Sequence, residues 1–193
     1  MAILKIARMG HPVLLGRAAE VADAANPEIR RLIRDMAETL ADSGGVGLAA
    51  PQVFIPLRLF LYHMPDTGTE NHVPDTGTET GTAMPYGVAI NPRITPLSPE
   101  RELGWEGCLS IPGLRGAVPR YRHIRLSAYD EAGQRFEQEL TGFAARIIQH
   151  EYDHLDGVLY PMRMEDFRFF GFTEETARFP RPLPQPEPAE SAP

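Results

Sequence analysis

The chain has 193 residues, a length that suits one domain with a single sizeable core. Hydrophobic residues make up 42% of it and charged residues 23%, the balance of an ordinary soluble globular protein. The net charge of −7 argues against sequence-independent binding to nucleic acid and against docking on anionic lipid. No apolar run reaches the ~18 residues of a membrane-spanning helix, and the N-terminus lacks the apolar core of a secretory signal, so we expect a cytoplasmic protein.

The first predicted element is a helix over residues 27–43. Asn26 is a favourable N-cap, and Pro27 suits the first helical turn. Apolar residues recur at helical spacing along the segment, and the Gly44-Gly45 pair ends it. One face of this helix is therefore expected to be buried as part of the scaffold.

Residues 45–52 are predicted to form a loop of small residues, and residues 57–63 a strand. The hexapeptide PDTGTE occurs twice within 64–85, where we expect an exposed, variable loop, because two copies of so short a unit cannot form a solenoid. A further strand is predicted over 86–94, with a bend at its Asn-Pro pair.

Residues 122–129 and 134–140 alternate apolar and polar residues around an Asp-Glu-Ala-Gly turn, which predicts a β-hairpin. A second long helix is predicted over 142–156, closed by Gly157.

The C-terminal part of the chain gives weaker signals. A third helix is predicted over 164–178, although Gly171 and the clustered phenylalanines do not favour it. Residues 180–193 contain six prolines and are predicted to be a disordered tail. Residues 1–179 are expected to form a single domain.

The strongest chemical signal is an HExxH pattern, His150-Glu151-Tyr152-Asp153-His154, within the second long helix. Residues four apart lie on one helix face, so both imidazoles can bind one metal ion and Glu151 can reach a water on that ion. Two histidines at this spacing also occur as a surface pair. A two-histidine site would need a third ligand.

The candidate third ligand is Cys108, the only cysteine, in the segment Glu106-Gly107-Cys108-Leu109-Ser110. This segment is predicted to be a strand that ends in a tight loop, and a thiolate is a strong ligand for a divalent transition metal. A lone cysteine is more often a small buried hydrophobe, and a nucleophile paired with a histidine is another alternative. One cysteine and two histidines would leave a fourth position for water, which is typical of a catalytic site.

Three segments, in this order, resemble the peptide deformylase family: 45–52 (GVGLAAPQ), 106–110 (EGCLS) and 149–154 (QHEYDH). The resemblance runs from about residue 6 to about residue 164. It implies an α+β fold in which mixed, mainly antiparallel strands pack around the central HExxH-bearing helix. It also implies a hydrolase of protein biosynthesis that removes the formyl group from N-formylmethionine on newly made polypeptides.

The resemblance assigns roles to particular residues. The implied metal ligands are Cys108, His150 and His154. The ion would be Fe(II) natively, and zinc, nickel or cobalt can take its place. Glu151 takes the acid–base role, while the side-chain amide of Gln52 and the backbone N–H of Leu109 stabilise the oxyanion.

The resemblance also implies how substrate is held. Backbone groups near Val46, Gly47 and Gly107 would pair with the peptide as an added strand, and Arg115 matches a position near the bound peptide. The expected partners are N-formylmethionyl nascent peptides and, transiently, the ribosome, with no nucleic-acid specificity and no membrane.

Other interpretations of individual residues stay open. The arginines at 120, 122 and 125 are interpreted as a solvated strand face, although one of them could pair with Glu106. Phe54 stands where the family often has a glycine. The apolar side chains of Phe143, Ile147 and Ile148 are either walls of a methionine pocket or ordinary core.

Two other functions are compatible with the HExxH pattern. One is a zinc metalloprotease, which would usually carry a third ligand downstream of the helix, and the short remaining chain offers no convincing motif. The other is a non-catalytic peptide-binding protein of the same fold, which the presence of the three ligands, Glu151 and Gln52 disfavours.

Overall fold

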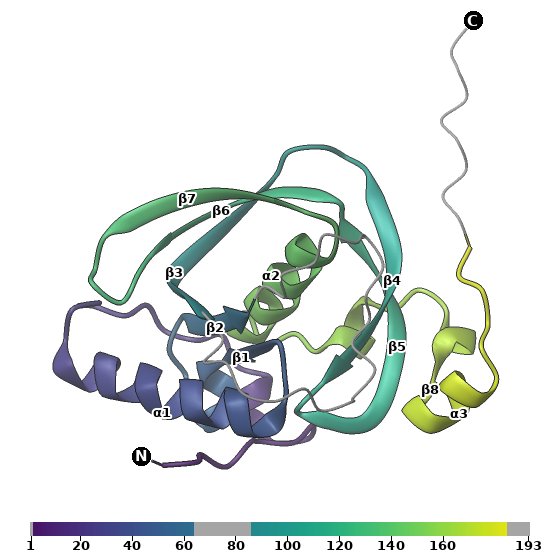
Figure 1. The fold of residues 1–193 in the computed structure, drawn as a ribbon, viewed down its shortest axis with the longest axis horizontal. Helices are drawn as coiled ribbons and strands as arrows, with labels where there is room; N and C mark the ends of the chain where they lie inside the picture. The colour runs from purple at the N-terminus through teal and green to yellow at the C-terminus, as the bar shows by residue number, and fades with distance from the viewer. Residues whose placement is uncertain (1, 64–85, 185–193) are drawn as a thin grey trace, which may run out of the picture.

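The computed structural model describes residues 2–63 and 86–184. Two antiparallel sheets surround the central helix α2 (Gly142–Leu155), as Figure 1 shows. The predicted α+β class, with mainly antiparallel strands around the HExxH helix, is confirmed. No helix among the described residues is both long and apolar enough to cross a bilayer.

The larger sheet has the strand order β1-β2-β3-β6-β7. Its strands are β1 (Gly47–Ala49), β2 (Leu59–His63), β3 (Tyr86–Pro96), β6 (His123–Tyr129) and β7 (Arg135–Thr141). The predicted strands and the β6–β7 hairpin are confirmed. The predicted bend in β3 is a register shift between Ile90 and Arg93, where Asn91 has a φ of 49°.

The smaller sheet consists of β4 (Arg101–Cys108), β5 (Ile111–Tyr121) and β8 (Phe170–Phe172). The prediction of a helix over 164–178 is wrong for most of that segment. Gly171 pairs with Arg115, so the backbone there extends the β5 ladder, and only α3 (Thr173–Arg178) is helical. The 3-10 turn η4 (Phe167–Phe169) precedes β8, and Figure 1 shows β8 and α3 beyond β5.

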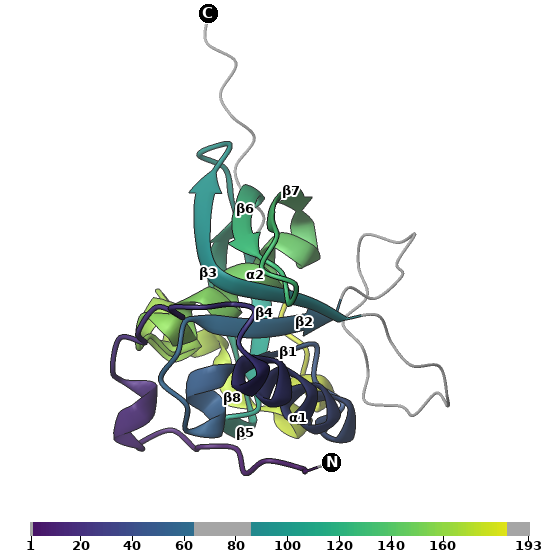
Figure 2. The ribbon, with the colours of Figure 1, turned by 90° about the vertical axis from the view of Figure 1, so that its left-hand side faces the viewer.

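Helix α1 (Pro27–Ser43) has the predicted bounds. The side chain of Asn26 accepts a hydrogen bond from the backbone N–H of Glu28, and Gly44 ends the helix in the left-handed conformation with φ 64°. Its apolar face, including Ile33 and Met36, packs into a core shared with β1 and β2, which lie next to α1 (Figure 2).

The segment predicted as a loop over 45–52 divides into β1 and a 3-10 turn, η2 (Ala50–Val53). Phe54 follows with a φ of 67°, a left-handed conformation that favours glycine. Its ring contacts the His11 ring edge to face at 5.0 Å. Two further 3-10 turns are η1 (Pro12–Leu14) and η3 (Tyr160–Arg163).

Helix α2 is buried along most of its length. Ile147 and Ile148 lie in the core between this helix and the large sheet, with Phe143 packed against it, so the core interpretation of these side chains is confirmed. Gly157 has a φ of 73° and lies against the Leu15 carbonyl, so the chain turns where a side chain would clash. The predicted exposed loop (64–85) and most of the predicted disordered tail lie outside the described residues.

Candidate metal centre

The structure brings Cys108, at the end of β4, next to His150 and His154 on α2. One ligand atom from each residue lies within 4.8 Å of the other two. Cys108 Sγ is 3.3 Å from His154 Nε2. A sulfur from the middle of the chain and two imidazoles from a late helix thus meet at one place, as the predicted metal site requires.

The chemistry of this donor set suits a divalent transition metal. Burial by itself raises the pKa of the Cys108 thiol, but the adjacent His154 and His150 outweigh burial and hold that pKa well below its ordinary value. The thiolate is the form that binds metal. The positions of the three donor atoms and the thiolate form of Cys108 therefore fit an ion.

Glu151 lies beside these ligands and has an unsatisfied oxygen. Glu151 is 4% exposed, and its Oε2 has no hydrogen-bond partner among the described residues. Burial raises its pKa to about 7, against the opposing effect of His150 and His154. Because a buried carboxylate oxygen without a partner is costly, its position points to a polar ligand that the site receives.

The side-chain amide of Gln52, on η2, is held in one orientation. Its Oε1 accepts a hydrogen bond from the Ala49 N–H at 2.8 Å, which assigns the NH₂ group to the other side. Nε2 donates to Ser110 Oγ at 3.2 Å and lies 3.5 Å from Cys108 Sγ. One amide hydrogen is thus donated to Ser110, and the other points toward Cys108, one member of the donor set. Leu109 follows Cys108 directly at the end of β4.

The carboxylate of Glu106 orients His150. Its Oε2 lies 2.8 Å from His150 Nδ1, which leaves Nε2 of that ring for a ligand. Arg120 donates to both carboxylate oxygens, at 2.8 and 3.0 Å, and also to Asp153 at 2.6 Å. Burial opposes ionisation of Glu106, but the hydrogen bonds from Arg120 and His150 bring its pKa well below the ordinary value.

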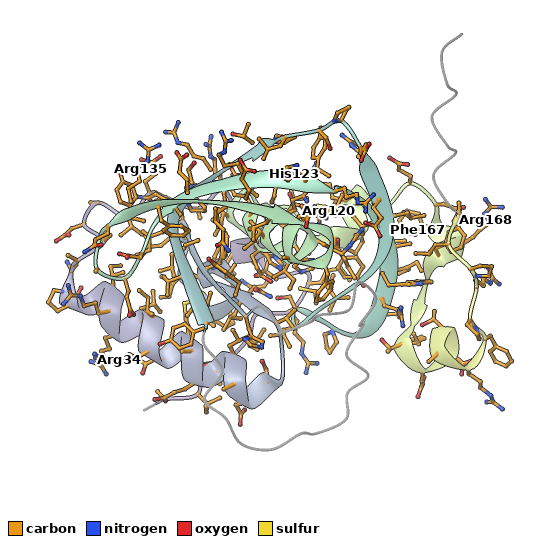
Figure 3. All side chains as sticks on the ribbon, turned by 45° about the horizontal axis from the view of Figure 1, so that its top comes forward. Arg34, Arg120, His123, Arg135, Phe167 and Arg168 are labelled. Atoms are coloured by element: carbon orange, nitrogen blue, oxygen red, sulfur yellow. The ribbon has the colours of Figure 1, made fainter. Side chains whose placement is uncertain are left out.

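The interpretation of Arg120 as a solvated residue is therefore wrong, whereas its pairing with Glu106 is confirmed. Arg120 is 5% exposed, and its side chain lies between α2 and the β4–β5 hairpin, while Arg34 and Arg135 lie at the periphery (Figure 3). On β5, Arg120 and Val118 are both on the inward face of the strand. The surrounding sequence does not reveal which residues of β5 face inward. Arg122 is exposed, and Arg125 pairs with Glu139 near the surface.

The residues predicted to contact the substrate lie in three places: Val46 and Gly47 at the start of β1, Gly107 on β4, and Arg115 on β5. Gly107 pairs with Arg115, and the guanidinium carbon of Arg115 lies 4.4 Å from the centre of the Trp105 ring. Because neighbouring strand residues face opposite ways, Arg115 lies on the other face of the hairpin from Glu106. The carbonyl of Val46 accepts from the His63 N–H at 2.8 Å. Gly47 lies against Glu151.

Sequence reasoning did not identify several residues around the site. Tyr160 stacks on His150 with ring centres 6.1 Å apart, and its buried hydroxyl has no hydrogen-bond partner among the described residues. Arg163 closes the network by donating to Asp153. In the sequence, only its closeness to Cys108 points to Ser110. Tyr160 and Arg163 have no sequence feature that distinguishes them from an ordinary aromatic or charged residue.

The chain is similar to known proteins over most of its length. The family model described as polypeptide deformylase matches residues 3–169. A protein of Bordetella pertussis named peptide deformylase 1 is 53% identical over 169 residues, 88% of this chain and 92% of the relative. One of Nitrosomonas europaea with the same name is 44% identical over 172 residues, 89% of this chain and 93% of the relative.

Solved structures show the same fold. A class I type b peptide deformylase from Acinetobacter baumannii has a TM-score of 0.73 at 34% identity, covering 85% of this chain and 100% of that one. A peptide deformylase from Synechococcus elongatus in complex with actinonin has a TM-score of 0.71 at 36% identity, covering 84% of this chain and 79% of that one.

Proposed function

Since this chain belongs to the peptide deformylase family, we propose that Cys108, His150 and His154 hold its metal ion while Glu151 and Gln52 act on the substrate. The chain is a hydrolase that removes the formyl group from N-formylmethionine at the start of new polypeptides and releases formate. The observation that carries the residue assignment is the convergence of one sulfur and two imidazole nitrogens within 4.8 Å.

Peptide deformylases are metalloenzymes, and the donor set here suits one divalent ion. We assign Fe(II) as the native ion, with zinc, nickel or cobalt as replacements. When bound, the ion supplies Lewis-acid activation of the formyl carbonyl and of the attacking water. The thiolate of Cys108 is then engaged as a ligand, which disfavours its alternative role as a nucleophile.

Glu151 moves the proton. Its free, buried Oε2 accepts a proton from the attacking water, whose oxygen ends in formate. The same carboxyl group then delivers that proton to the methionine nitrogen as the C–N bond breaks. Burial keeps bulk water away from Glu151, so the proton stays available for the leaving amine.

Gln52 and the backbone N–H of Leu109 stabilise the negative charge that develops on the formyl oxygen. The hydrogen bond from the Ala49 N–H fixes the Gln52 amide before substrate arrives, so little reorganisation is needed. One such donor typically lowers the barrier by ~3 kcal/mol.

The peptide chain is proposed to bind as an extra strand along the free edge of β1. This strand is the first of its sheet, and only β2 pairs with it among the described strands. Val46, Gly47 and Gly107 supply backbone groups. Arg115 is proposed to contact the peptide beyond the methionine, although its guanidinium stacks on Trp105 on the far face of the hairpin.

The proposed location and partners of the protein follow from its substrate. We propose that residues 1–179 act as one catalytic domain in the cytoplasm, where it meets nascent chains and, transiently, the ribosome. The proposed partners include neither nucleic acid nor a membrane.

Formate release is the deciding assay. Protein purified without oxygen is expected to release formate from formyl-Met peptides and to leave unformylated peptides intact. Cleavage of internal peptide bonds without formate release would favour the metalloprotease, and peptide binding without either reaction would favour the non-catalytic protein. Glu151→Ala should retain the metal and lose formate release; full activity in this variant would remove the assigned base.

A further inference from the structure

Arg146 shares the Glu106 carboxylate with the metal-ligand candidate His150. Glu106 Oε1 accepts from Arg146 Nη1 at 3.0 Å and from Arg120 Nε at 2.8 Å. Its Oε2 accepts from Arg120 Nη2 and lies 2.8 Å from His150 Nδ1. Four hydrogen bonds thus hold the carboxylate, and no rotation of its plane could keep all of them.

The same guanidinium joins α2 to both strands of the β4–β5 hairpin. Nη1 also donates to the carbonyls of Gly104, at 3.2 Å, and Val118, at 2.7 Å, and Nη2 donates to the Glu102 carbonyl at 2.6 Å. Arg146 lies one helical turn before His150, on the same helix face. It therefore links the histidine's helix to the strand that ends at Cys108.

Gly104 provides the space for this contact. A Cβ built on Gly104 would lie 2.6 Å from Cζ of Arg146, so any side chain there would displace the guanidinium. Burial in this position lowers the pKa of Arg146, which shows that desolvation of the cation is unfavourable. An apolar side chain of similar length would avoid that cost, but it could neither hold Glu106 nor donate to the three carbonyls.

We propose that Arg146 is a positioning residue for the metal site: it fixes the Glu106 carboxylate, and through it the His150 imidazole, relative to Cys108. This inference rests on the proposed function, because it takes His150 as a ligand. A group that hydrogen-bonds a metal ligand, as Glu106 does here, typically changes metal affinity by about 10- to 100-fold when it is substituted. Arg146 itself touches neither the ion nor the substrate.

The test measures metal retention in protein loaded with cobalt(II). The rate of cobalt loss to excess chelator and the visible absorption of the bound cobalt are compared for wild type, Arg146→Met, Arg146→Lys and Gly104→Ala. The variants are expected to lose cobalt about 10-fold faster or more, with altered absorption bands. Gly104→Ala keeps the arginine and only displaces it. This variant therefore tests the positioning role of Arg146 even if Arg146→Met does not fold.

Gln149→Met is the matched control. Gln149 also joins α2 to the neighbouring strand, through the backbone N–H and carbonyl of Tyr121, but it does not bond to Glu106. It should lower thermal stability while keeping cobalt loss within about twofold of wild type. Equal acceleration in this control, or unchanged cobalt loss in both Arg146→Met and Gly104→Ala, would overturn the proposal. Wild-type protein that binds no cobalt would instead remove the proposed metal site.

Discussion

Gly47 lies directly against the side chain of Glu151. A Cβ built on Gly47 would be 2.6 Å from the carboxyl carbon of Glu151, well inside van der Waals contact. The absence of a side chain at this point of β1 thus sets the position of the proposed general base. The lack of a side chain at Gly47 leaves room for Glu151, in addition to its proposed role in the approach of a peptide.

Gly47→Ala should therefore impair catalysis without removing a chemical group. Displacement of the Glu151 carboxylate by about 1 Å is expected to lower kcat by about 100-fold, with metal content unchanged. Formate-release kinetics and metal analysis check this. Gly16→Ala is the control, because its Cβ would be 4.0 Å from its nearest neighbour, the Pro12 carbonyl oxygen, and wild-type kinetics are expected. Normal kcat in Gly47→Ala would show that Glu151 is not held as described.

Glu106→Gln should destabilise the fold more than removal of a surface charge. Arg146 would lose the carboxylate that compensates its buried charge, and Arg120 would keep only its pair with Asp153. Breaking such a buried pair typically costs about 3–5 kcal/mol, measured here as the free energy of unfolding in urea. Glu139→Gln breaks an exposed pair with Arg125 and is expected to leave the unfolding midpoint unchanged. Equal midpoints for both variants would contradict the assigned network.

Ser110→Ala tests how the Gln52 amide is held. Ser110 is fully buried, and its Oγ accepts a hydrogen bond from Gln52 Nε2. Loss of this acceptor should cost ~1 kcal/mol of barrier lowering, or about a fivefold decrease in kcat. The sharper measurement is the double-mutant cycle with Gln52→Ala, in which Ser110→Ala should have no further effect. Additive losses would mean that Ser110 acts independently of Gln52.

Tyr160→Phe should be tolerated. The buried hydroxyl has no partner among the described residues, so its removal deletes an unsatisfied polar group while the ring remains on His150. The free energy of unfolding is expected to stay level or rise by about 1 kcal/mol, and Tyr160→Leu, which removes the ring, should destabilise instead. A large loss of stability in Tyr160→Phe would reveal a hydrogen bond to a bound water.

The sequence predicted those elements whose signals are local. Helix α1 has the predicted bounds because Asn26 and Gly44 cap it and its apolar period is regular. The β6–β7 hairpin follows from alternation around a glycine-containing turn. The helix prediction over 164–178 failed because pairing of Gly171 with Arg115, distant in sequence, decides the backbone conformation there.

The residues of the site also divide into those with local sequence signals and those placed by distant packing. Spacing within one helix indicated His150, Glu151 and His154, and the short motif around Cys108 suggested the sulfur. The positions of Arg120 and Arg146 depend on which face of β5 and α2 turns toward Glu106, and this is set by the packing of distant segments. In the sequence, a buried charged residue cannot be distinguished from an exposed one until that packing is known.

The coordination of the metal tests the central claim most directly. X-ray absorption spectroscopy on protein purified without oxygen would count the sulfur and nitrogen neighbours of the bound ion in wild type and in Cys108→Ser. We expect one sulfur and two imidazole nitrogens in the wild type, and no sulfur in the variant. A wild-type ion surrounded only by oxygen or nitrogen would contradict the account.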